Sequence, residues 1–231
     1  MTDRDAQKRA AAERAVEHVR SGMRLGLGTG STARHVVDII GAQLRDGTLR
    51  DIVAVPTSRA TEAQARSLGI PLATLDDVHE LDLAIDGADE IDPKLDLIKG
   101  LGGALLWEKI VESAAARLII VADDSKLVQT LGEKAPLPVE VVPFGAGALL
   151  PFFRTLGAEP SLRQGDDGAP FVTDSGHYIA DLRFTGGMRD ASAVESQLRA
   201  RPGVVETGLF LGMADVAVIA GRAGIEVRNR K

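Results

Sequence analysis

The chain has 231 residues, of which 45% are hydrophobic and 26% charged, and its formal net charge is −6. This balance is typical of a globular protein of one or two domains and excludes a disordered or fibrous chain. The longest apolar runs, Leu118 to Ala122 and Val216 to Ala220, are far shorter than the roughly 20 residues that a membrane helix needs. The charged start of the sequence has no pattern of a cleavable signal, so we expect a cytoplasmic protein with no membrane partner.

The composition also excludes several kinds of chemistry. The chain has no cysteine, which excludes disulfides, thiolate nucleophiles and cysteine-based zinc sites. The four histidines are scattered without metal-binding spacing, and we expect no metal. No run of Lys or Arg is present and aromatic residues make up 3%, so we expect no nucleic-acid partner. An anion can bind this acidic chain only through a local site.

Helix-like and strand-like segments alternate through the first half of the chain. The helix-like segments are 5–19, 32–44, 58–68 and 104–116, and the strand-like segments are 24–28, 52–55, 81–86 and 118–122. Unbroken apolar strands that alternate with helices predict an α/β fold with a parallel sheet. We therefore expect a Rossmann-like, mostly parallel sheet with helices on both faces.

The pattern changes after residue 126. Strand-like segments at 139–142, 159–163, 178–184 and 204–209 are joined by helix-like segments at 146–156 and 192–200. This order, βαββαβ, is that of the ferredoxin-like unit. The apolar segment 216–220 is expected to return to the first sheet. The sequence thus predicts a Rossmann-like domain at 1–129 and 208–231, with a small inserted ferredoxin-like α+β domain at 130–207.

A glycine loop, Gly26 to Ala33, lies between the first predicted strand and its helix. Glycines let the backbone approach a ligand closely, and the N–H groups at a helix start can bind an anion. Thr29 adds a hydroxyl group, and Ser31 or Thr32 can cap the helix. A tight turn without a ligand would have the same composition, so both readings stay open.

Comparison with known nucleotide-binding patterns indicates which anion the loop suits. The loop satisfies the dinucleotide pattern G-x-G-x-x-A, but that pattern expects an acidic residue at the end of the second strand. Here the second strand ends at Pro56-Thr57-Ser58, and no lysine follows the glycines as in a nucleotide-binding P-loop. A small phosphate ester therefore suits the loop better than NAD or ATP.

An acidic segment, Asp86 to Asp92, follows the third predicted strand. Ligands of open α/β sheets bind at the carboxyl ends of the strands, and carboxylates accept hydrogen bonds from sugar hydroxyl groups. Gly87 and Ala88 are small enough for a substrate to lie against the backbone. The alternative is a solvated acidic turn.

A second glycine loop, Lys99 to Ala104, precedes the helix that contains Glu108. The helical spacing places Glu108 at the border of the buried stripe, and partial burial suits a carboxylate to act as general base near neutral pH. An ordinary surface glutamate is the alternative, and we expect Glu112 to be one. Trp107, the only tryptophan, is expected in packing, and Lys126 and Lys99 stand at strand ends where they can attract an anion.

Together these motifs resemble the A-type ribose-5-phosphate isomerases. The resemblance covers nearly the whole chain and comprises GTGST at Gly28–Thr32, DGADE at Asp86–Glu90, KGxGGA at Lys99–Ala104, EK at Glu108-Lys109, DDSK at Asp123–Lys126 and ETGLF at Glu206–Phe210. It implies an aldose–ketose isomerase of the non-oxidative pentose phosphate pathway. It also implies that the enzyme uses no metal and no cofactor, and that it is a homodimer or homotetramer.

The resemblance also implies residue roles. Glu108 matches the general base, while Asp86, Asp89 and Lys99 match groups that bind the sugar end and assist proton transfer. The positions that match substrate-binding residues are Lys8, Thr29, Gly30, Ser31, Thr32, Asp86, Gly87, Ala88, Asp89, Lys99, Gly100, Leu101, Gly102 and Lys126. The chain departs from the family pattern at Leu101, which usually is glycine, and at Trp107, which usually is arginine.

Two other functions would account for some of these motifs. A regulatory domain could bind a sugar phosphate without catalysis, although it should then carry a helix-turn-helix, for which the N-terminal helix leaves no room. An NAD-dependent dehydrogenase would explain the first glycine loop, although the carboxylate that binds the ribose is missing.

Overall fold

The computed structural model describes residues 3–230, which form two compact units. The first unit contains the described residues up to Ala88, Trp107–Lys126 and the described residues from Met213 onward. The second unit contains Asp89–Leu106 and Leu127–Gly212. The domain ranges expected from the sequence differ from these units mainly at residues 89–106, which belong to the second unit.

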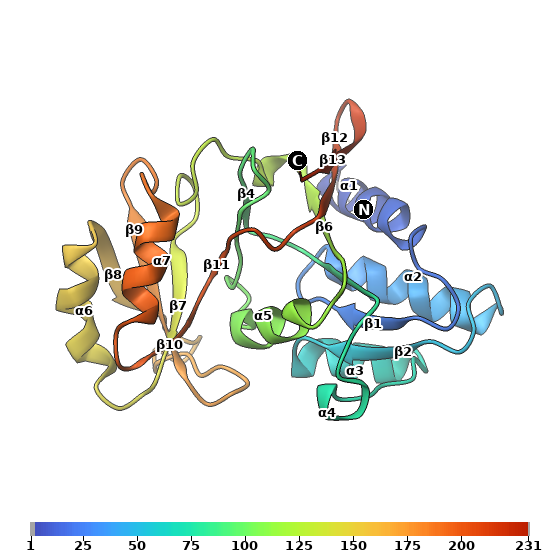
Figure 1. The fold of residues 1–231 in the computed structure, drawn as a ribbon, viewed down its shortest axis with the longest axis horizontal. Coiled ribbons are helices and arrows are strands. Elements are labelled where there is room, and N and C mark those ends of the chain that lie inside the picture. Colours follow the sequence, from blue (N-terminus) through green and yellow to red (C-terminus); the bar gives the residue numbers. More distant parts are fainter. Residues whose placement is uncertain (1–2, 231) are drawn as a thin grey trace. The chain divides into compact units, whose positions relative to one another are not determined.

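The first unit is built on a six-stranded sheet (Figure 1) with the order β13-β12-β6-β3-β1-β2. All neighbouring strands pair in parallel except β12 and β13, which are antiparallel. The strands are β1 (Arg24–Leu27), β2 (Val53–Pro56), β3 (Leu83–Asp86), β6 (Leu118–Asp123), β12 (Val216–Gly221) and β13 (Gly224–Asn229). The predicted α/β class, the mostly parallel sheet and the return of 216–220 to this sheet are confirmed.

Helices cover both faces of this sheet. They are α1 (Asp3–Val16), α2 (Ala33–Arg45), α3 (Arg59–Ser67), α4 (Leu75–Val78) and α5 (Leu105–Ser113), with a 3₁₀ turn η1 at Asp124–Lys126. Side chains of α1 and α2 form one core cluster with Leu25 and Leu27 of β1. Gly26 faces the other side, where a Cβ atom would lie 2.9 Å from Cγ1 of Val111 in α5. Alternation along β1 therefore places α5 on the face opposite α2.

The second unit contains a four-stranded antiparallel sheet with the order β10-β7-β9-β8. Its elements are β7 (Leu137–Val141), α6 (Ala146–Thr155), β8 (Ala158–Leu162), β9 (Tyr178–Phe184), α7 (Ala191–Arg199) and β10 (Val204–Thr207). This order and connectivity are those of the predicted ferredoxin-like unit. Phe153, Leu182 and Leu198 are fully buried between the helices and the sheet.

Several short elements have no counterpart in the sequence prediction. A three-stranded sheet joins β11 (Leu209–Phe210), β5 (Leu97–Ile98) and β4 (Glu90–Ile91), and α4 and β13 were also not predicted. The predicted strand 204–209 is interrupted at Gly208, where a Cβ atom would lie 2.3 Å from the carbonyl oxygen of Lys99. Within residues 3–230, no helix is both long enough and apolar enough to cross a membrane.

Candidate functional site

The first glycine loop connects β1 to α2 and presents its backbone N–H groups at the start of the helix. Gly30 has a φ angle of 112°, which a residue with a side chain rarely adopts. Among residues 3–230 no protein acceptor takes the N–H groups of Ser31, Thr32 or Ala33. Lys8 Nζ donates a hydrogen bond of 2.9 Å to Ser31 Oγ. Amides, a hydroxyl group and an ammonium group thus lie together, as an anion site requires.

Thr32 occupies the N-cap position of α2, but its side chain makes no capping hydrogen bond. Ser31 and Thr32 were both possible caps, and neither side chain forms a capping hydrogen bond at this helix. The Thr32 backbone has helical angles, φ −87° and ψ −45°, whereas a capping side chain usually needs an extended residue. Arg34 and His35 N–H donate to the carbonyl oxygens of Gly30 and Thr32, so only the amides of residues 31–33 have no acceptor within the described chain.

Asp86 braces this loop from the end of β3. The carboxylate is fully buried, and Oδ1 accepts hydrogen bonds from the N–H groups of Thr29 at 2.9 Å and Gly87 at 2.6 Å. A Cβ atom on Gly28 would lie 2.1 Å from Asp86 Oδ1, so only glycine allows this approach. Gly87 follows Asp86 in the chain, and a Cβ atom there would meet no atom closer than 3.9 Å. The space beside its backbone is therefore open.

A cluster of four hydroxyl groups supports the same loop. Thr29 Oγ1 lies 2.7 Å from Thr57 Oγ1, 2.8 Å from Ser58 Oγ and 3.1 Å from Thr61 Oγ1. Thr61 in turn donates to the carbonyl oxygen of Gly28 at 3.0 Å. Sequence reasoning noted Thr57 and Ser58 only as positions without a carboxylate. Hydroxyl residues at the ends of two neighbouring strands were the signal that could have indicated this cluster.

Glu108 lies in the first turn of α5, directly after the second glycine loop. Its side chain is only 5% exposed, which agrees with the expectation that this carboxylate is withdrawn from water. Glu112, one turn further on, is 3% exposed, so the prediction of a surface glutamate is wrong. Glu112 lies one turn after Glu108 on the same face of α5, which also buries Leu105 and Val111, so both carboxylates are covered. Lys126 lies in η1, at the end of β6, and is partly exposed.

The second glycine loop, Lys99–Gly103, belongs to the second unit. Lys99 is 2% exposed, its N–H group donates to the carbonyl oxygen of Gly208 at 2.9 Å, and Nζ lies 5.3 Å from the centroid of the Phe210 ring. A cation over an aromatic face is stabilised by the ring quadrupole. The structure therefore holds a lysine side chain in a nearly dry environment, where its charge acts strongly on a neighbouring anion.

The peptide groups of this loop are partly used by the protein itself. Leu101 N–H donates to Asp89 Oδ2 at 2.9 Å, and Gly103 N–H donates to the carbonyl oxygen of Gly100 at 3.0 Å. Within the described chain, Gly102 N–H has no protein acceptor. Gly100 and Gly103 have positive φ angles, whereas Leu101 does not. This explains why a leucine is accepted at position 101.

Glu90, the last residue of the DGADE motif, has a structural role. It is fully buried, and its carboxylate accepts hydrogen bonds from the N–H groups of Gly132, Lys134 and Ala135 at 2.5–2.7 Å. Three backbone donors satisfy a buried carboxylate well. Within the acidic segment, Asp86 therefore fixes backbone in the first unit and Glu90 fixes backbone in the second.

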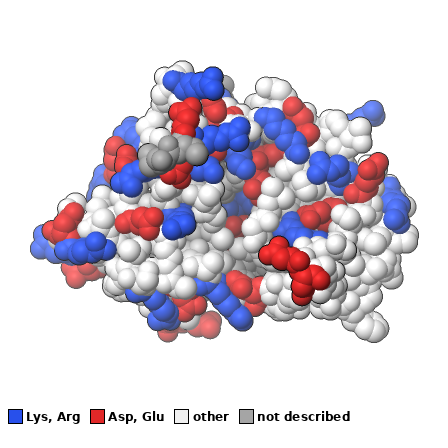
Figure 2. All heavy atoms as spheres, turned by 180° about the vertical axis from the view of Figure 1, so that it is seen from behind, with Lys and Arg blue, Asp and Glu red and all other residues white. Residues whose placement is uncertain are grey.

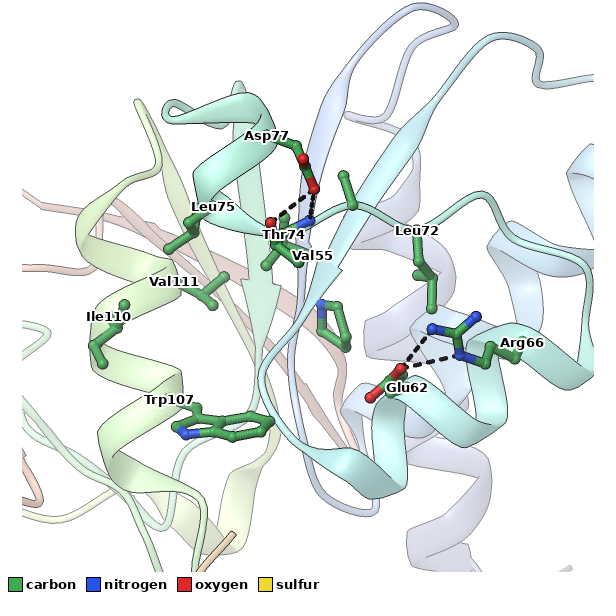
Figure 3. A pocket seen from close by; sticks show the side chains of 12 residues that line it. Val55, Glu62, Arg66, Leu72, Thr74, Leu75, Asp77, Trp107, Ile110 and Val111 are labelled. Carbon is green, nitrogen blue, oxygen red and sulfur yellow. Dashed lines mark hydrogen bonds and ion pairs between the residues drawn. The ribbon is translucent and has the colours of Figure 1, made fainter. Parts of the chain in front are cut away.

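A separate pocket of about 440 Å³ lies in the first unit between β2, α3, α4 and α5. Figure 3 shows Trp107, Ile110 and Val111 on one side and the Arg66–Glu62 ion pair on the other. Thr74 and Asp77 at its rim are hydrogen-bonded to each other. The pocket contains none of the residues that match the family's site. Trp107 is half-buried here and takes part in lining a hollow rather than filling a core.

The charges of the described residues are interspersed. On the face drawn in Figure 2, basic and acidic side chains alternate over the surface. With a net charge of −6, long-range attraction does not favour an anion. An anion could bind only through local groups, and Lys8 beside the first loop and Lys99 in the second are candidates for this.

The sequence is similar to known proteins over nearly its whole length. The family model described as ribose 5-phosphate isomerase A (phosphoriboisomerase A) matches residues 53–224. The chain is 54% identical to the ribose-5-phosphate isomerase A of Nitrobacter hamburgensis, over 98% of this chain and 99% of that protein. The chain belongs to the ribose-5-phosphate isomerase A family.

Further relatives agree with this assignment. The ribose-5-phosphate isomerase A of Roseiflexus castenholzii is 56% identical over 94% of this chain and 93% of that protein. A solved D-ribose-5-phosphate isomerase in complex with phospho-erythronic acid superposes with a TM-score of 0.96 at 39% identity, covering 99% of this chain and 100% of that one. These relatives are isomerases, so the alternative of a regulatory domain without catalysis is not supported.

The candidate residues of this family member divide between the two units. The first unit contains Lys8, Thr29–Thr32, Asp86–Ala88, Glu108 and Lys126. The second unit contains Asp89, Lys99, Gly100, Leu101 and Gly102. Each unit thus carries one glycine loop with a lysine and an aspartate.

Proposed function

We propose that this chain interconverts D-ribose 5-phosphate and D-ribulose 5-phosphate through an enediolate, with Glu108 as the general base. The proposal rests on family membership over nearly the whole chain and on one observation, the burial of the Glu108 carboxylate in the first turn of α5. A carboxylate held out of bulk water is suited to take and return a proton near neutral pH.

The reaction moves one proton between two carbon atoms. In the forward direction the Glu108 carboxylate removes the proton from C2 of the aldose, and the electrons of that C–H bond form the C1–C2 double bond of the enediolate. The hydroxyl proton on O2 is lost as O1 gains a proton, and Glu108 returns its proton to C1. Aldose and ketose are isomers, so the balanced reaction needs no net oxidant or reductant. Asp86 and Asp89 are proposed to bind the sugar hydroxyl groups and to assist the proton exchange between O1 and O2.

The negative charge that develops on the oxygen requires preorganised donors. We assign this role to Lys99, whose ammonium group is almost fully buried, and to the amides of Gly100 and Gly102. Leu101 N–H and Gly103 N–H already have protein acceptors. The loss of one such donor typically costs about 2.7–4 kcal/mol of transition-state stabilisation.

The phosphate group is assigned to the first glycine loop. The free amides at the start of α2, the Ser31 hydroxyl group and the ammonium group of Lys8 support this assignment. Thr29 is proposed to act through the shape of the loop, since its hydroxyl group lies within the hydroxyl cluster. Lys126 is proposed to add positive charge to the substrate site. Phosphate binding orients the substrate and carries no step of the proton transfer.

We further propose that the protein is cytoplasmic and forms a homodimer or homotetramer. Both proposals follow from the likeness to the isomerase family. The mass of the assembly in solution, measured by sedimentation equilibrium, tests the second one, and a monomer at all concentrations would contradict it.

The activity is tested by incubating the purified protein with ribose 5-phosphate in the absence of NAD and following ketose formation. We expect turnover without any added cofactor. Binding of ribose 5-phosphate without ketose formation would instead indicate a regulatory domain, and turnover that depends on NAD would indicate a dehydrogenase. Arabinose 5-phosphate, which is epimeric at C2, should bind at the same site with little or no conversion.

A further inference from the structure

Arg163, the residue directly after β8, contacts the backbone carbonyl groups of the second glycine loop. Its Nη1 donates hydrogen bonds to the carbonyl oxygens of Gly100 and Leu101, both at 3.0 Å. All three residues belong to the second unit. No motif drew attention to this arginine, because it is 62 residues away from Leu101 in the sequence.

The guanidinium group is itself held in place. Its Nε lies 2.9 Å from Asp181 Oδ2 and its Nη2 lies 2.5 Å from Asp181 Oδ1, so the two side chains form a bidentate pair. The Arg163 side chain is 13% exposed and that of Asp181 is 19% exposed. A planar guanidinium group gripped on two nitrogens has little freedom left, and its third nitrogen points in a fixed direction.

Phe171 adds a second contact from the same segment. Its N–H group donates to the carbonyl oxygen of Arg163 at 2.9 Å, and the Arg163 Cζ lies 5.7 Å from the centroid of the phenyl ring. A Cβ atom on Gly103 would lie 2.5 Å from Cζ of that ring. The segment that follows β8 therefore holds the loop both at its carbonyl groups and at its last glycine.

The geometry of the peptide group gives these contacts a consequence for the N–H groups. The C=O and N–H of one trans peptide point in opposite directions. The carbonyl of Gly100 shares a peptide with Leu101 N–H, and the carbonyl of Leu101 shares one with Gly102 N–H. Asp89 accepts the Leu101 N–H at 2.9 Å, on the side away from Arg163. The same hydrogen bonds aim the Gly102 N–H away from Arg163, and a cation at a peptide oxygen also polarises that peptide's N–H.

We propose that Arg163, fixed by Asp181, is a positioning residue that aims and polarises the Gly102 N–H, one of the donors assigned to the enediolate. This inference rests on the proposed isomerase function. Arg163 itself makes no contact with substrate in this account. It acts through the peptide groups of Gly100 and Leu101, so its loss should affect the transition state more than the bound substrate.

The test compares Arg163→Lys with Arg183→Lys. Lysine keeps the positive charge but cannot bridge Asp181 and two carbonyl groups at once. Arg183, an exposed residue of β9 two positions after Asp181, is the matched control. We expect Arg163→Lys to lower kcat by roughly 10- to 100-fold, less than the approximately 100- to 1000-fold that follows removal of an oxyanion donor itself. KM should change by less than about threefold, and Arg183→Lys should resemble the wild type.

Two further readouts separate positioning from a structural role. Phospho-erythronic acid carries a carboxylate whose two negative oxygens imitate the enediolate, so its inhibition constant should rise by about the same factor as kcat falls. In Arg163→Ala, added guanidinium ion should restore part of kcat without raising the unfolding temperature, because guanidinium is itself a denaturant. Wild-type kcat in Arg163→Lys would overturn the proposal, as would a loss that follows the unfolding temperature and is not rescued, or a rise in KM alone.

The outcomes for this inference and for the function are distinct. If the wild type and Arg183→Lys convert ribose 5-phosphate and Arg163→Lys does so equally well, only the role of Arg163 is refuted. If the wild type forms no ketose, the isomerase function is refuted, and the role of Arg163 is refuted with it.

Discussion

Both glycine loops of this protein lead into a helix, but opposite groups hold them. The first loop is braced by Asp86, a buried carboxylate that accepts two backbone N–H groups. The second is held by Arg163, a cation that donates to two backbone carbonyl groups, and by Asp89 on one amide. Two similar sequence motifs thus present their backbone to a ligand in different ways.

The difference suits two kinds of negative charge. A phosphate group is charged throughout the reaction, so in the proposed assignment the amides, hydroxyl group and lysine of the first loop would bind substrate and transition state alike. An enediolate oxygen becomes charged only during the reaction, so a few donors fixed in advance by rigid contacts contribute to the rate. Variants of the first loop should therefore change KM, and variants of the second loop and the base should change kcat.

The largest effect is expected for Glu108→Gln. The amide cannot act as a base, so kcat should fall by roughly 10²–10⁴-fold, while the affinity for phospho-erythronic acid, measured by calorimetry, should be retained. Glu112→Gln is the matched control, because it removes a second buried carboxylate from the same helix. Near-normal turnover of Glu108→Gln would contradict the role of this residue as general base.

The next largest effect is expected for Lys99→Met, which keeps the length of the side chain but removes its charge. We expect kcat to fall by roughly 10²–10³-fold with little change in KM, because the lost donor acts on the developing oxyanion. Lys94→Met, an exposed lysine of the same unit, serves as control. A rise in KM at unchanged kcat would assign Lys99 to substrate binding and break the contrast between the loops.

A smaller effect, of the opposite kind, is expected in the first loop. In Lys8→Met, KM for ribose 5-phosphate should rise by up to about fivefold at unchanged kcat, since a solvent-accessible ionic contact contributes about 0–1 kcal/mol. The increase should shrink at high salt, which screens exposed charges. Arg4→Met, an exposed cation of α1, controls for net charge. If Lys8→Met lowers kcat instead, the division of labour between the loops is not as proposed.

The fold was predictable where elements are long and bury one face. The predicted strand 178–184 is the range that β9 occupies, and the apolar run Leu118 to Ala122 predicted β6 to within one residue. β4 and β5 have two residues each, too few for any period to appear. β13 was missed because most of its residues are exposed, so no apolar pattern marks it.

The candidate site was predictable where its signal is local. Glycines beside a predicted helix and an acidic residue one turn inside it, such as Glu108, can be found without a structure. The contact of Arg163 with Gly100 depends on how β8 and the loop are brought together, and no local pattern contains that information. The burial of Glu112 was missed although it lies one turn after Glu108 on the same face of α5, because a glutamate is ordinarily exposed.

The smallest effect concerns pH and the segment that holds the second loop. Burial raises the pKa of Glu140, whose carboxylate accepts hydrogen bonds from Thr173 Oγ1 at 2.9 Å and pairs with His177 Nδ1 at 3.0 Å. Thr173 N–H donates to the carbonyl oxygen of His177 at 2.8 Å and closes a turn two residues after Phe171, and the charge of Asp174 also acts on Glu140. A raised folded-state pKa means that the carboxylic acid stabilises the fold below its unfolded pKa and loses this contribution as pH rises through the folded value.

The unfolding temperature of the wild type should therefore fall relative to that of Glu140→Gln as pH rises from about 4 towards 7, because glutamine cannot lose a proton. The relative fall should persist when both proteins carry His177→Gln, since burial and not the histidine is the main cause of the raised pKa. Amide exchange should show the matching change in residues 163–178 and none in the first loop. A wild-type unfolding temperature that stays constant or rises relative to that of Glu140→Gln as pH increases would show that the carboxylate is ionised at little cost. The contacts of Arg163 and Phe171 with the second loop would then be as insensitive to pH as we expect the first loop to be.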